Sequence, residues 1–245
     1  MARFITADEA LNRVIAEVGL APVAAPYSSA DPAFVQMQYL INTAGAELLE
    51  EFPWANLVRS HQILTQLGDS GSYPLPEDYA YMIDQTGWER AENVPLFGPL
   101  SAQQWTYLLG RDLVSYTIYA SFRLFDNTFN LFPQPPATSM DVNFEYISRN
   151  WVKAGNQADT FRDQIQVGSD IILYPPILIT RLLKARFMQS RGFDTTGSMA
   201  EYQNALQSWK GKDNSAPILN QGNRGWTYPY LDGLRNTPDT NFGGN

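Results

Sequence analysis

The sequence predicts an α+β fold in which both ends of the chain build a helical bundle around an inserted, antiparallel, β-rich domain. Apolar residues recur with a helical period in residues 1–54 and 172–211, whereas residues 55–171 carry short runs of β-branched and aromatic residues. A third observation is that Asn, Gly, Pro and Asp dominate residues 212–245, without any sustained period. We therefore expect a discontinuous bundle (1–54 and 172–211), a β-rich insertion (55–171) and an extended C-terminal arm (212–245).

Two helices are predicted in the N-terminal part of the bundle. The first begins at Thr6, which forms a capping box with Glu9, and ends near Gly19. The second follows Asp31-Pro32, which suit a helix start, and stops before Pro53. Each has one apolar face, so each needs a packing partner.

The helix predicted over residues 176–191 should be the centre of the bundle. Pro175 and Pro176 suit a first helical turn, and a broad apolar arc that includes Leu182 follows them. Arg186 falls inside this arc, so its side chain must either extend to solvent or meet a carboxylate. A further helix over residues 198–210 is expected, with Ser198 and Glu201 as its capping box.

The middle of the chain shows the period of strands. Four runs combine β-branched and aromatic residues, and they lie at residues 56–65, 115–122, 128–132 and 142–151. A short helix should interrupt them, because Ser101 and Gln104 approximate a capping box ahead of Trp105. We expect Trp88 and Trp105 to hold the proline-rich segments between the strands against a core.

Composition excludes several classes of function. The chain has 245 residues, a formal net charge of −8 and no cysteine, which argues against a phosphate-binding surface, a thiolate metal site and a cysteine nucleophile. His61 is the only histidine, and no phosphate-binding loop, dinucleotide fingerprint or serine-nucleophile elbow is present. We expect no catalytic, cofactor or metal site; the adjacent acids Glu50-Glu51 and Glu77-Asp78 are interpreted as surface residues.

The arm carries large apolar residues that a merely disordered tail seldom has. Its prolines favour extended conformations, which lowers the entropy lost on docking. We therefore predict that the arm is a docking segment, with six anchors: Ile218, Leu219, Trp226, Tyr228, Tyr230 and Leu231. Neither a signal peptide nor an apolar run that could span a bilayer is recognisable, so no membrane partner is expected.

Several spaced motifs follow one another along the chain. They are residues 73–79 (Tyr-Pro-Leu-Pro-Glu-Asp-Tyr), 86–90 (Thr-Gly-Trp-Glu-Arg), 95–101 (Pro-Leu-Phe-Gly-Pro-Leu-Ser), Trp105, 144–151 (Phe-Glu-Tyr-Ile-Ser-Arg-Asn-Trp), the helix at 182–192, and Glu201-Tyr202. No single motif is specific, but in their order and spacing, over nearly the whole chain, they together resemble the head-to-tail adaptor (tail accessory) proteins of short-tailed bacteriophages.

The resemblance implies a structural protein of the virion, assembled in the host cytoplasm. It implies a homo-oligomeric ring, of twelve copies, that sits beneath the portal protein and receives the tail knob, the nozzle or a tail fibre. DNA would pass through its lumen without sequence-specific binding, and the ring would help to retain the packaged genome; the arm would dock on the portal or on a neighbouring subunit. Two alternatives stay open: a tail-associated peptidoglycan hydrolase, and a tail-fibre or capsid-binding module without channel function.

Overall fold

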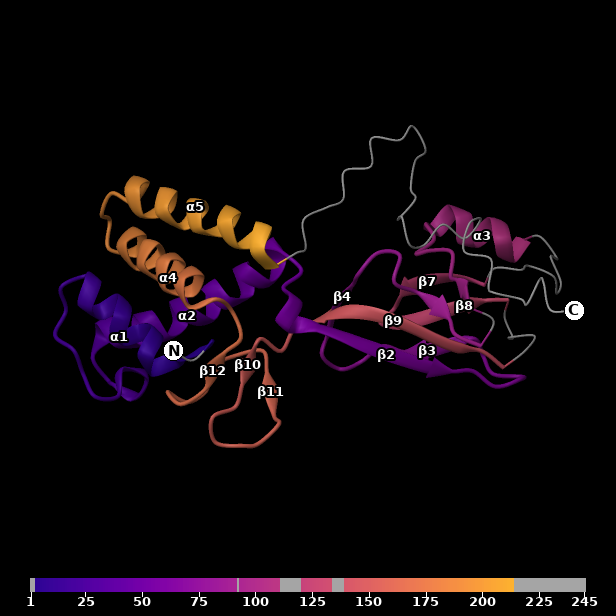
Figure 1. Cartoon of the computed structure of the whole chain (residues 1–245), viewed down its shortest axis with the longest axis horizontal. Helices are drawn as coiled ribbons and strands as arrows, with labels where there is room; N and C mark the ends of the chain where they lie inside the picture. Colours follow the sequence, from indigo (N-terminus) through magenta and orange to yellow (C-terminus); the bar gives the residue numbers. More distant parts are fainter. Residues whose placement is uncertain (1–2, 92, 111–119, 134–138, 214–245) are drawn as a thin grey trace, which may run out of the picture.

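A computed structural model of the chain describes residues 3–91, 93–110, 120–133 and 139–213. These residues form two lobes joined end to end, one mostly helical and one rich in antiparallel strands (Figure 1). The α+β class is therefore confirmed, and every strand pairing within the sheets of the described residues is antiparallel.

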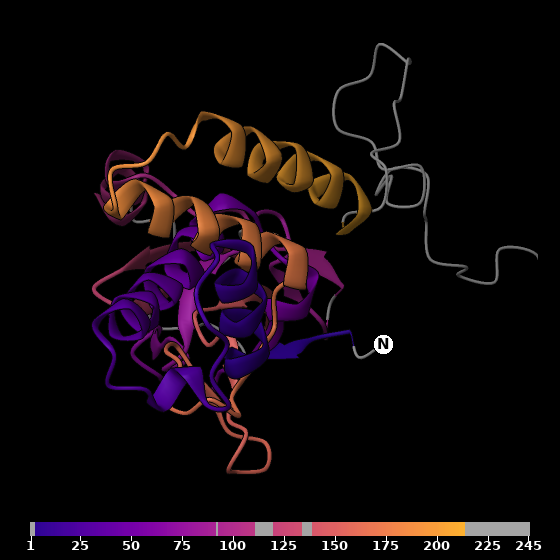
Figure 2. The same ribbon diagram turned by 90° about the vertical axis from the view of Figure 1, so that its left-hand side faces the viewer.

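The helical lobe is organised around α4, which packs against the three other helices of that lobe. The side chains of Leu178, Ile179, Leu182 and Leu183 on α4 are almost completely buried in the core that these helices share. In the view from the end of this lobe, α4 and α5 lie one above the other over α1 and α2 (Figure 2). The four helices are α1 (Ala7–Glu17), α2 (Pro32–Glu51), α4 (Pro176–Ser190) and α5 (Thr196–Asp213).

Local capping signals explain where α1 and α2 begin. The backbone N–H of Glu9 donates to Thr6 Oγ1 at 3.2 Å, and the Glu9 carboxylate accepts from the Thr6 N–H at 3.4 Å, so the predicted capping box is present. The backbone N–H of Ala33 donates to Asp31 Oδ1 at 2.8 Å, which caps α2. A short 3₁₀ turn, η1 (Pro26–Ser28), lies between the two helices.

The predicted start of the last helix is wrong by two residues. The helix α5 begins at Thr196, whose backbone N–H donates to Asp194 Oδ1 at 2.9 Å, and it continues to Asp213. Ser198 therefore lies inside the first turn, where its hydroxyl donates to the sulfur of Met188. Of the two outcomes expected for Arg186, contact with a carboxylate is confirmed, because its guanidinium donates to Glu47 on α2 at 2.8 Å.

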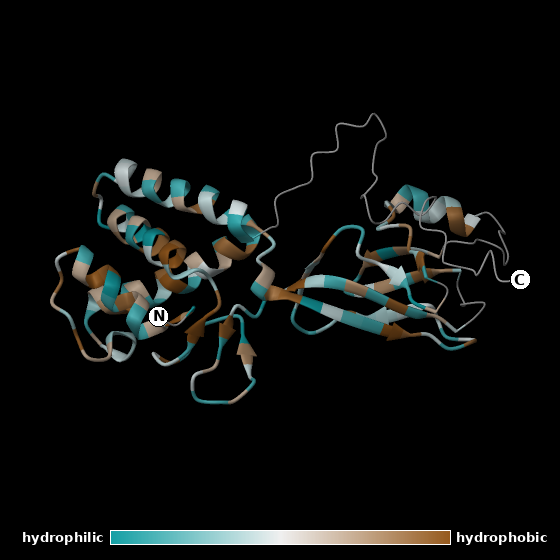
Figure 3. Cartoon of the chain, in the orientation of Figure 1, coloured by the Kyte–Doolittle hydropathy of each residue, from teal (hydrophilic) through white to brown (hydrophobic). Residues whose placement is uncertain are grey.

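A small sheet covers one side of the helical lobe, and its short strands are mostly apolar (Figure 3). Its residues Val152 and Ile172 are fully buried in the helical core together with Trp151. This part of the chain, which the sequence analysis had assigned to the β-rich insertion, thus packs against the helices. The strand order is β1 (Ile5–Thr6), β12 (Ile171–Ile172), β10 (Val152–Lys153) and β11 (Phe161–Arg162).

Two further sheets share the core of the β-rich lobe. At its centre the aromatic ring of Phe129 stacks between those of Phe122 and Phe144, with centroids 4.7 Å and 5.2 Å away. One sheet has the order β2 (Val58–Leu64), β9 (Asp141–Ser148), β5 (Trp88–Glu89) and β6 (Val94–Pro95), and β4 (Tyr79–Met82) also pairs with β9. The other has the order β3 (Ser72–Pro74), β8 (Thr128–Phe132) and β7 (Ser121–Phe125).

A fifth helix, α3 (Ala102–Gly110), lies on the outside of the β-rich lobe. Trp105 on this helix is 4% exposed and contacts Phe132 edge to face, with ring centroids 6.3 Å apart, as expected of a residue that fastens the segment to a core. Trp88, by contrast, is only half-buried. The expected strand at 115–122 corresponds in part to β7, which begins at Ser121; residues 111–119 lie outside the described residues.

The chain crosses between the lobes where β2 begins and where β9 ends. A 3₁₀ turn, η2 (Ala55–Leu57), precedes β2, and the side-chain amide of Asn56 donates to the carbonyl of Leu173 at 3.4 Å. The Arg59 guanidinium on β2 lies 5.3 Å from the ring centroid of Phe161 on β11, so a cation–π contact also links the lobes. The end of α5 reaches the same junction, because the carboxylate of Asp213 accepts from the Ala55 N–H at 2.7 Å.

Candidate functional site

Three of the motifs noted in the sequence, residues 73–79, 86–90 and 144–151, meet along β9. Asp78, from the motif at 73–79, accepts hydrogen bonds from the Tyr146 hydroxyl at 2.8 Å and the Ser148 hydroxyl at 2.6 Å. The backbone N–H of Arg149 also donates to the carbonyl of Asp78 at 2.7 Å. Burial, reinforced by the hydrogen bond to Asp78, raises the pKa of Tyr146 to about 12. We call Asp78, Tyr146 and Ser148 the Asp78 network; it fastens two distant motifs to each other.

A second motif is fastened to the other end of β9 by a buried carboxylate. Glu89 on β5 is 2% exposed, and its Oε1 accepts from the backbone N–H groups of Ala91 and Asp141, both at 3.1 Å. Its neighbour Trp88 lies opposite Asn143 of β9 and Pro95 of β6. Sequence reasoning missed the role of Glu89, because nothing in a two-residue strand signals that a carboxylate will be buried there.

The histidine and the acidic pairs considered for catalysis have structural contacts. His61 packs edge to face on Phe144, with centroids 5.5 Å apart, and burial lowers its pKa. Glu51 forms an ion pair with Lys210 at 3.1 Å.

Within the described ranges, no group of three or more His, Cys, Asp or Glu side chains could hold a metal ion. In the same part of the chain, no helix combines the length and apolar character needed to cross a bilayer.

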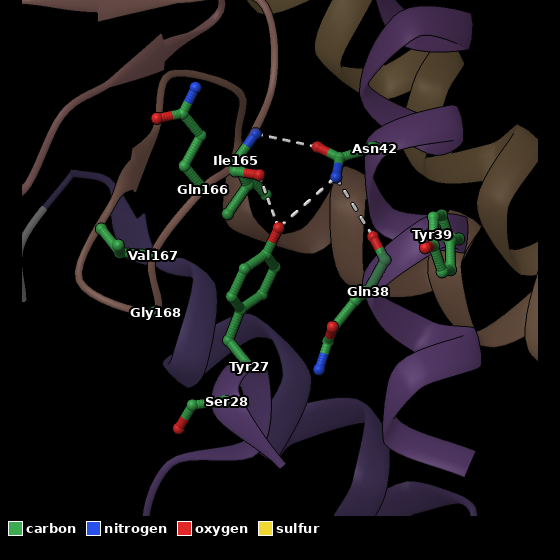
Figure 4. Close-up of a pocket in the computed structure, with 9 residues that line it drawn as sticks. All are labelled: Tyr27, Ser28, Gln38, Tyr39, Asn42, Ile165, Gln166, Val167 and Gly168. Carbon is green, nitrogen blue, oxygen red and sulfur yellow. Dashed lines mark hydrogen bonds between the residues drawn. The ribbon is translucent and has the colours of Figure 1, made fainter. Parts of the chain in front are cut away.

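A cavity of about 540 Å³ lies in the helical lobe between η1, α2 and the loop at 165–168 (Figure 4). Tyr27, Asn42 and Ile165, which line it, bond to one another. The Tyr27 hydroxyl donates to the carbonyl of Ile165 and accepts from the Asn42 amide, while Asn42 Oδ1 accepts from the Ile165 N–H at 2.8 Å. Burial raises the pKa of Tyr27 above its usual value. This arrangement connects three segments and presents no charged group to a ligand.

A smaller apolar groove, of about 340 Å³, lies on the β-rich lobe beside α3. Phe97 and Tyr107, which line it, are 62% and 55% exposed. Exposed aromatic side chains next to a groove are typical of protein-binding surfaces. Together with Leu64 at the end of β2 and Leu67 just after it, they place exposed large apolar side chains on the β-rich lobe.

The predicted docking anchors, Ile218, Leu219, Trp226, Tyr228, Tyr230 and Leu231, all lie outside the described residues, so the structure does not bring them to a site. The structure does fix where that segment leaves the body, at Asp213 beside Ala55. No protein-family model matches the chain, and no curated protein matches it.

Proposed function

We propose that this chain is a structural protein of the virion, a head-to-tail adaptor of a short-tailed bacteriophage that forms a ring beneath the portal. The observation that supports the proposal most is the convergence on β9 of three of the motifs that resemble that family. Residues 73–79 and 144–151 meet through the Asp78 network, and Trp88-Glu89 pairs with the other half of the strand. Motifs that share one framework are what a common fold requires, whereas a shared catalytic site would gather reactive side chains in a cleft.

The proposal includes the finer architecture and the partners. The helical lobe is a bundle from both chain ends, the β-rich lobe is an insertion, and the arm is the docking segment for the portal. The ring contains twelve copies, extends the DNA channel, helps to retain the genome and receives the tail knob, the nozzle or a fibre. A formal net charge of −8 suits a channel wall that repels phosphates and lets DNA pass.

The second candidate, a peptidoglycan hydrolase, would need two carboxyl groups facing each other across a cleft, about 5–10 Å apart. Of the adjacent acids, Asp78 accepts two hydroxyl hydrogen bonds, and Glu51 pairs with Lys210. These contacts favour a structural role for both acids. Loss of turbidity of purified peptidoglycan, abolished by a Glu or Asp substitution, would support the hydrolase instead.

The adaptor proposal can be tested by mixing the protein with rings of the portal protein from its own virus. Electron microscopy and sedimentation would show whether it adds a second ring. The truncation should end after Asp213, because this residue completes α5 and bonds to Ala55. We expect the full chain to join the portal, and the chain of residues 1–213 to unfold cooperatively but not to join.

A triple substitution, Trp226→Ala, Tyr228→Ala and Tyr230→Ala, is the matched variant of full length. It should weaken attachment strongly, since buried aromatic anchors typically contribute about 2 kcal/mol or more each. Attachment by residues 1–213 as strong as that of the full chain would show that the arm does not dock on the portal. Failure of the full chain to join the portal would contradict the adaptor proposal as a whole.

A further inference from the structure

The strand β2 leaves one of its two edges open. It is seven residues long, and in the described part of the chain it pairs only with β9. Figure 1 shows it running from the lobe junction toward the far end of the β-rich lobe. An unpaired edge presents a row of backbone N–H and C=O groups, and proteins normally cover or interrupt such edges.

The register identifies the groups that face outward. The backbone N–H of Thr65 donates to the carbonyl of Met140 at 2.9 Å. From this pair along β2 and β9, hydrogen-bonded residue pairs alternate with pairs that are not hydrogen-bonded. Consequently Ser60, Gln62 and Leu64 direct their backbone groups away from β9. Nothing in the described residues hydrogen-bonds to these three N–H and three C=O groups, whereas the outward carbonyl of Val58 accepts from the Arg59 guanidinium at 2.9 Å.

Two other sheet edges of the β-rich lobe, those of β3 and β6, are protected. On β3 the Ser70 hydroxyl both accepts from the Ser72 N–H at 3.2 Å and donates to the Ser72 carbonyl at 3.3 Å. The strand β6 has only two residues, one of them Pro95. By comparison β2 is long and open, and it ends at Leu64, whose side chain is 66% exposed.

The described part of the chain ends near the start of β2. Asp213, the last residue of α5, bonds to the N–H of Ala55, three residues before β2. Twelve residues, 214–225, separate Asp213 from Trp226. Extended, they span roughly 40 Å, whereas a seven-residue strand is only about 23 Å long. The connection is therefore long enough to pass the far end of β2 and to turn back along it.

The sequence at 226–231, Trp-Thr-Tyr-Pro-Tyr-Leu, has an aromatic residue at every second position, as a strand with one apolar face does. Pro229 has no N–H to donate. The backbone groups of Thr227, Pro229 and Leu231 must therefore face away from a pairing strand. Trp226, Tyr228 and Tyr230 then face the partner with three N–H and three C=O groups, which matches the number that β2 leaves open.

We propose that residues 226–231 add an antiparallel strand to the open edge of β2 in the same subunit. The pairs would be Trp226 with Leu64, Tyr228 with Gln62, and Tyr230 with Ser60, so that the largest ring covers the exposed leucine. Pro229 then limits the addition of a further strand at the new edge. The inference goes beyond the adaptor proposal and does not rest on it, because it concerns the free subunit; docking of the arm on the portal would displace the strand.

Disulfide trapping tests the inference cleanly, since the chain contains no cysteine. The full-length Gln62→Cys/Tyr228→Cys variant is oxidised at low protein concentration, and the products are mapped by peptide mass spectrometry. Directly opposed residues have the separation that a disulfide needs. The matched control is Ser72→Cys/Tyr228→Cys, at the protected edge of β3. We expect an intrachain disulfide to form at least about tenfold faster in the first variant, because pairing raises the effective concentration.

A second pair of variants tests the hydrogen bonds. In the Ser60→Cys/Tyr230→Cys protein, Gln62→Pro removes an outward N–H and should slow disulfide formation at least about fivefold, whereas Gln62→Ala should not. Amide exchange of β9 residues such as Phe144 checks that the sheet is intact. Equal rates at the β2 and β3 edges, or an unchanged rate in Gln62→Pro, would overturn the proposal. Disulfides that form only between chains would place the strand on a second copy and overturn the same-subunit assignment.

Discussion

Substitution of Gly45 by Ala tests the packing between the helices and the lobe junction. Gly45 lies in the middle of α2, where Ala would normally stabilise a helix by about 1 kcal/mol. A Cβ at this position, however, would overlap the indole ring of Trp151. That ring is 1% exposed and stacks on Tyr174 at 5.5 Å, and the Tyr174 hydroxyl donates to the Gly45 carbonyl at 3.0 Å. The ring therefore has little room to move.

Overpacking of this kind typically costs 1–3 kcal/mol. Because the overlap is with the body of a fixed ring and not with a flexible side-chain end, the upper part of that range applies. After subtraction of the helix-propensity gain, we expect Gly45→Ala to lower the free energy of unfolding by about 2 kcal/mol. Urea denaturation, with the slope of the transition compared between variants, would measure this change.

The matched control is Gly211→Ala in α5, where a Cβ would meet no atom within 4 Å. Here only helix propensity acts, so a gain of about 0.5 kcal/mol is expected. In the Trp151→Phe background the smaller ring should reduce the penalty of Gly45→Ala, which a double-mutant cycle would reveal. If Gly45→Ala stabilised the protein as much as Gly211→Ala does, the close contact with Trp151 would be refuted.

Three further outcomes are expected. Leu182→Ala should lower the free energy of unfolding by about 2–5 kcal/mol, because Leu182 is 1% exposed; a loss below about 0.5 kcal/mol in urea would place it outside the core. Burial lowers the pKa of His61, so as the pH falls the unfolded chain takes up a proton before the folded chain does, and the free energy of unfolding should decrease between pH 7 and 5. The substitution His61→Gln should make this decrease smaller, and an unchanged pH profile would contradict the burial of His61. Tyr146, with a pKa raised to about 12, keeps its proton at pH values where the unfolded chain loses it, so the free energy of unfolding should decrease as the pH rises from about 10 to 12. The substitution Tyr146→Phe should reduce the slope of this decrease with pH, and equal slopes would count against the Asp78 network.

The bundle helices could be predicted from the sequence because their signals are local. The capping box of Thr6 with Glu9 and the Asp31 cap act within one turn, and both are present in the structure. Because Arg186 lies inside an apolar arc, its charged side chain was expected to reach solvent or a carboxylate, and it forms an ion pair with Glu47. The prediction starts the last helix two residues too late, because the helix begins at Thr196, whose N–H donates to Asp194, and not after Ser198.

The small sheet could not be predicted in the same way. Its strands are two residues long, and their pairs, such as Ile5 with Ile172, join distant parts of the chain. The loop before β12 is held by Asp170, a fully buried carboxylate that accepts from the N–H groups of Gly155, Gln166 and Val167 at 2.8–3.1 Å. Such an arrangement leaves no periodic pattern in the sequence, because the carboxylate of one side chain accepts the backbone hydrogen bonds that a longer strand would form with its neighbour.

The candidate site shows the same division between local and distant information. The motif that contains Asp78 and the motif that contains Tyr146 were visible as separate segments, but 68 residues separate the two hydrogen-bonded side chains. Only the fold shows that both belong to one network. The docking anchors of the arm are a prediction from composition alone, since Trp226 and its neighbours lie outside the described residues.

The junction between the lobes therefore has a wider role than connecting two domains. The turn before β2 contains Ala55, which bonds to Asp213, and the contact of Arg59 with Phe161 spans the two lobes. Because the arm starts at Asp213, a rearrangement of the lobes that moves Ala55 also moves the origin of the arm relative to β2. Residues 55–59 thus hold both the hydrogen bond to the last residue of α5 and the cation–π contact between the lobes, so the end of α5 and the lobe junction depend on one short segment.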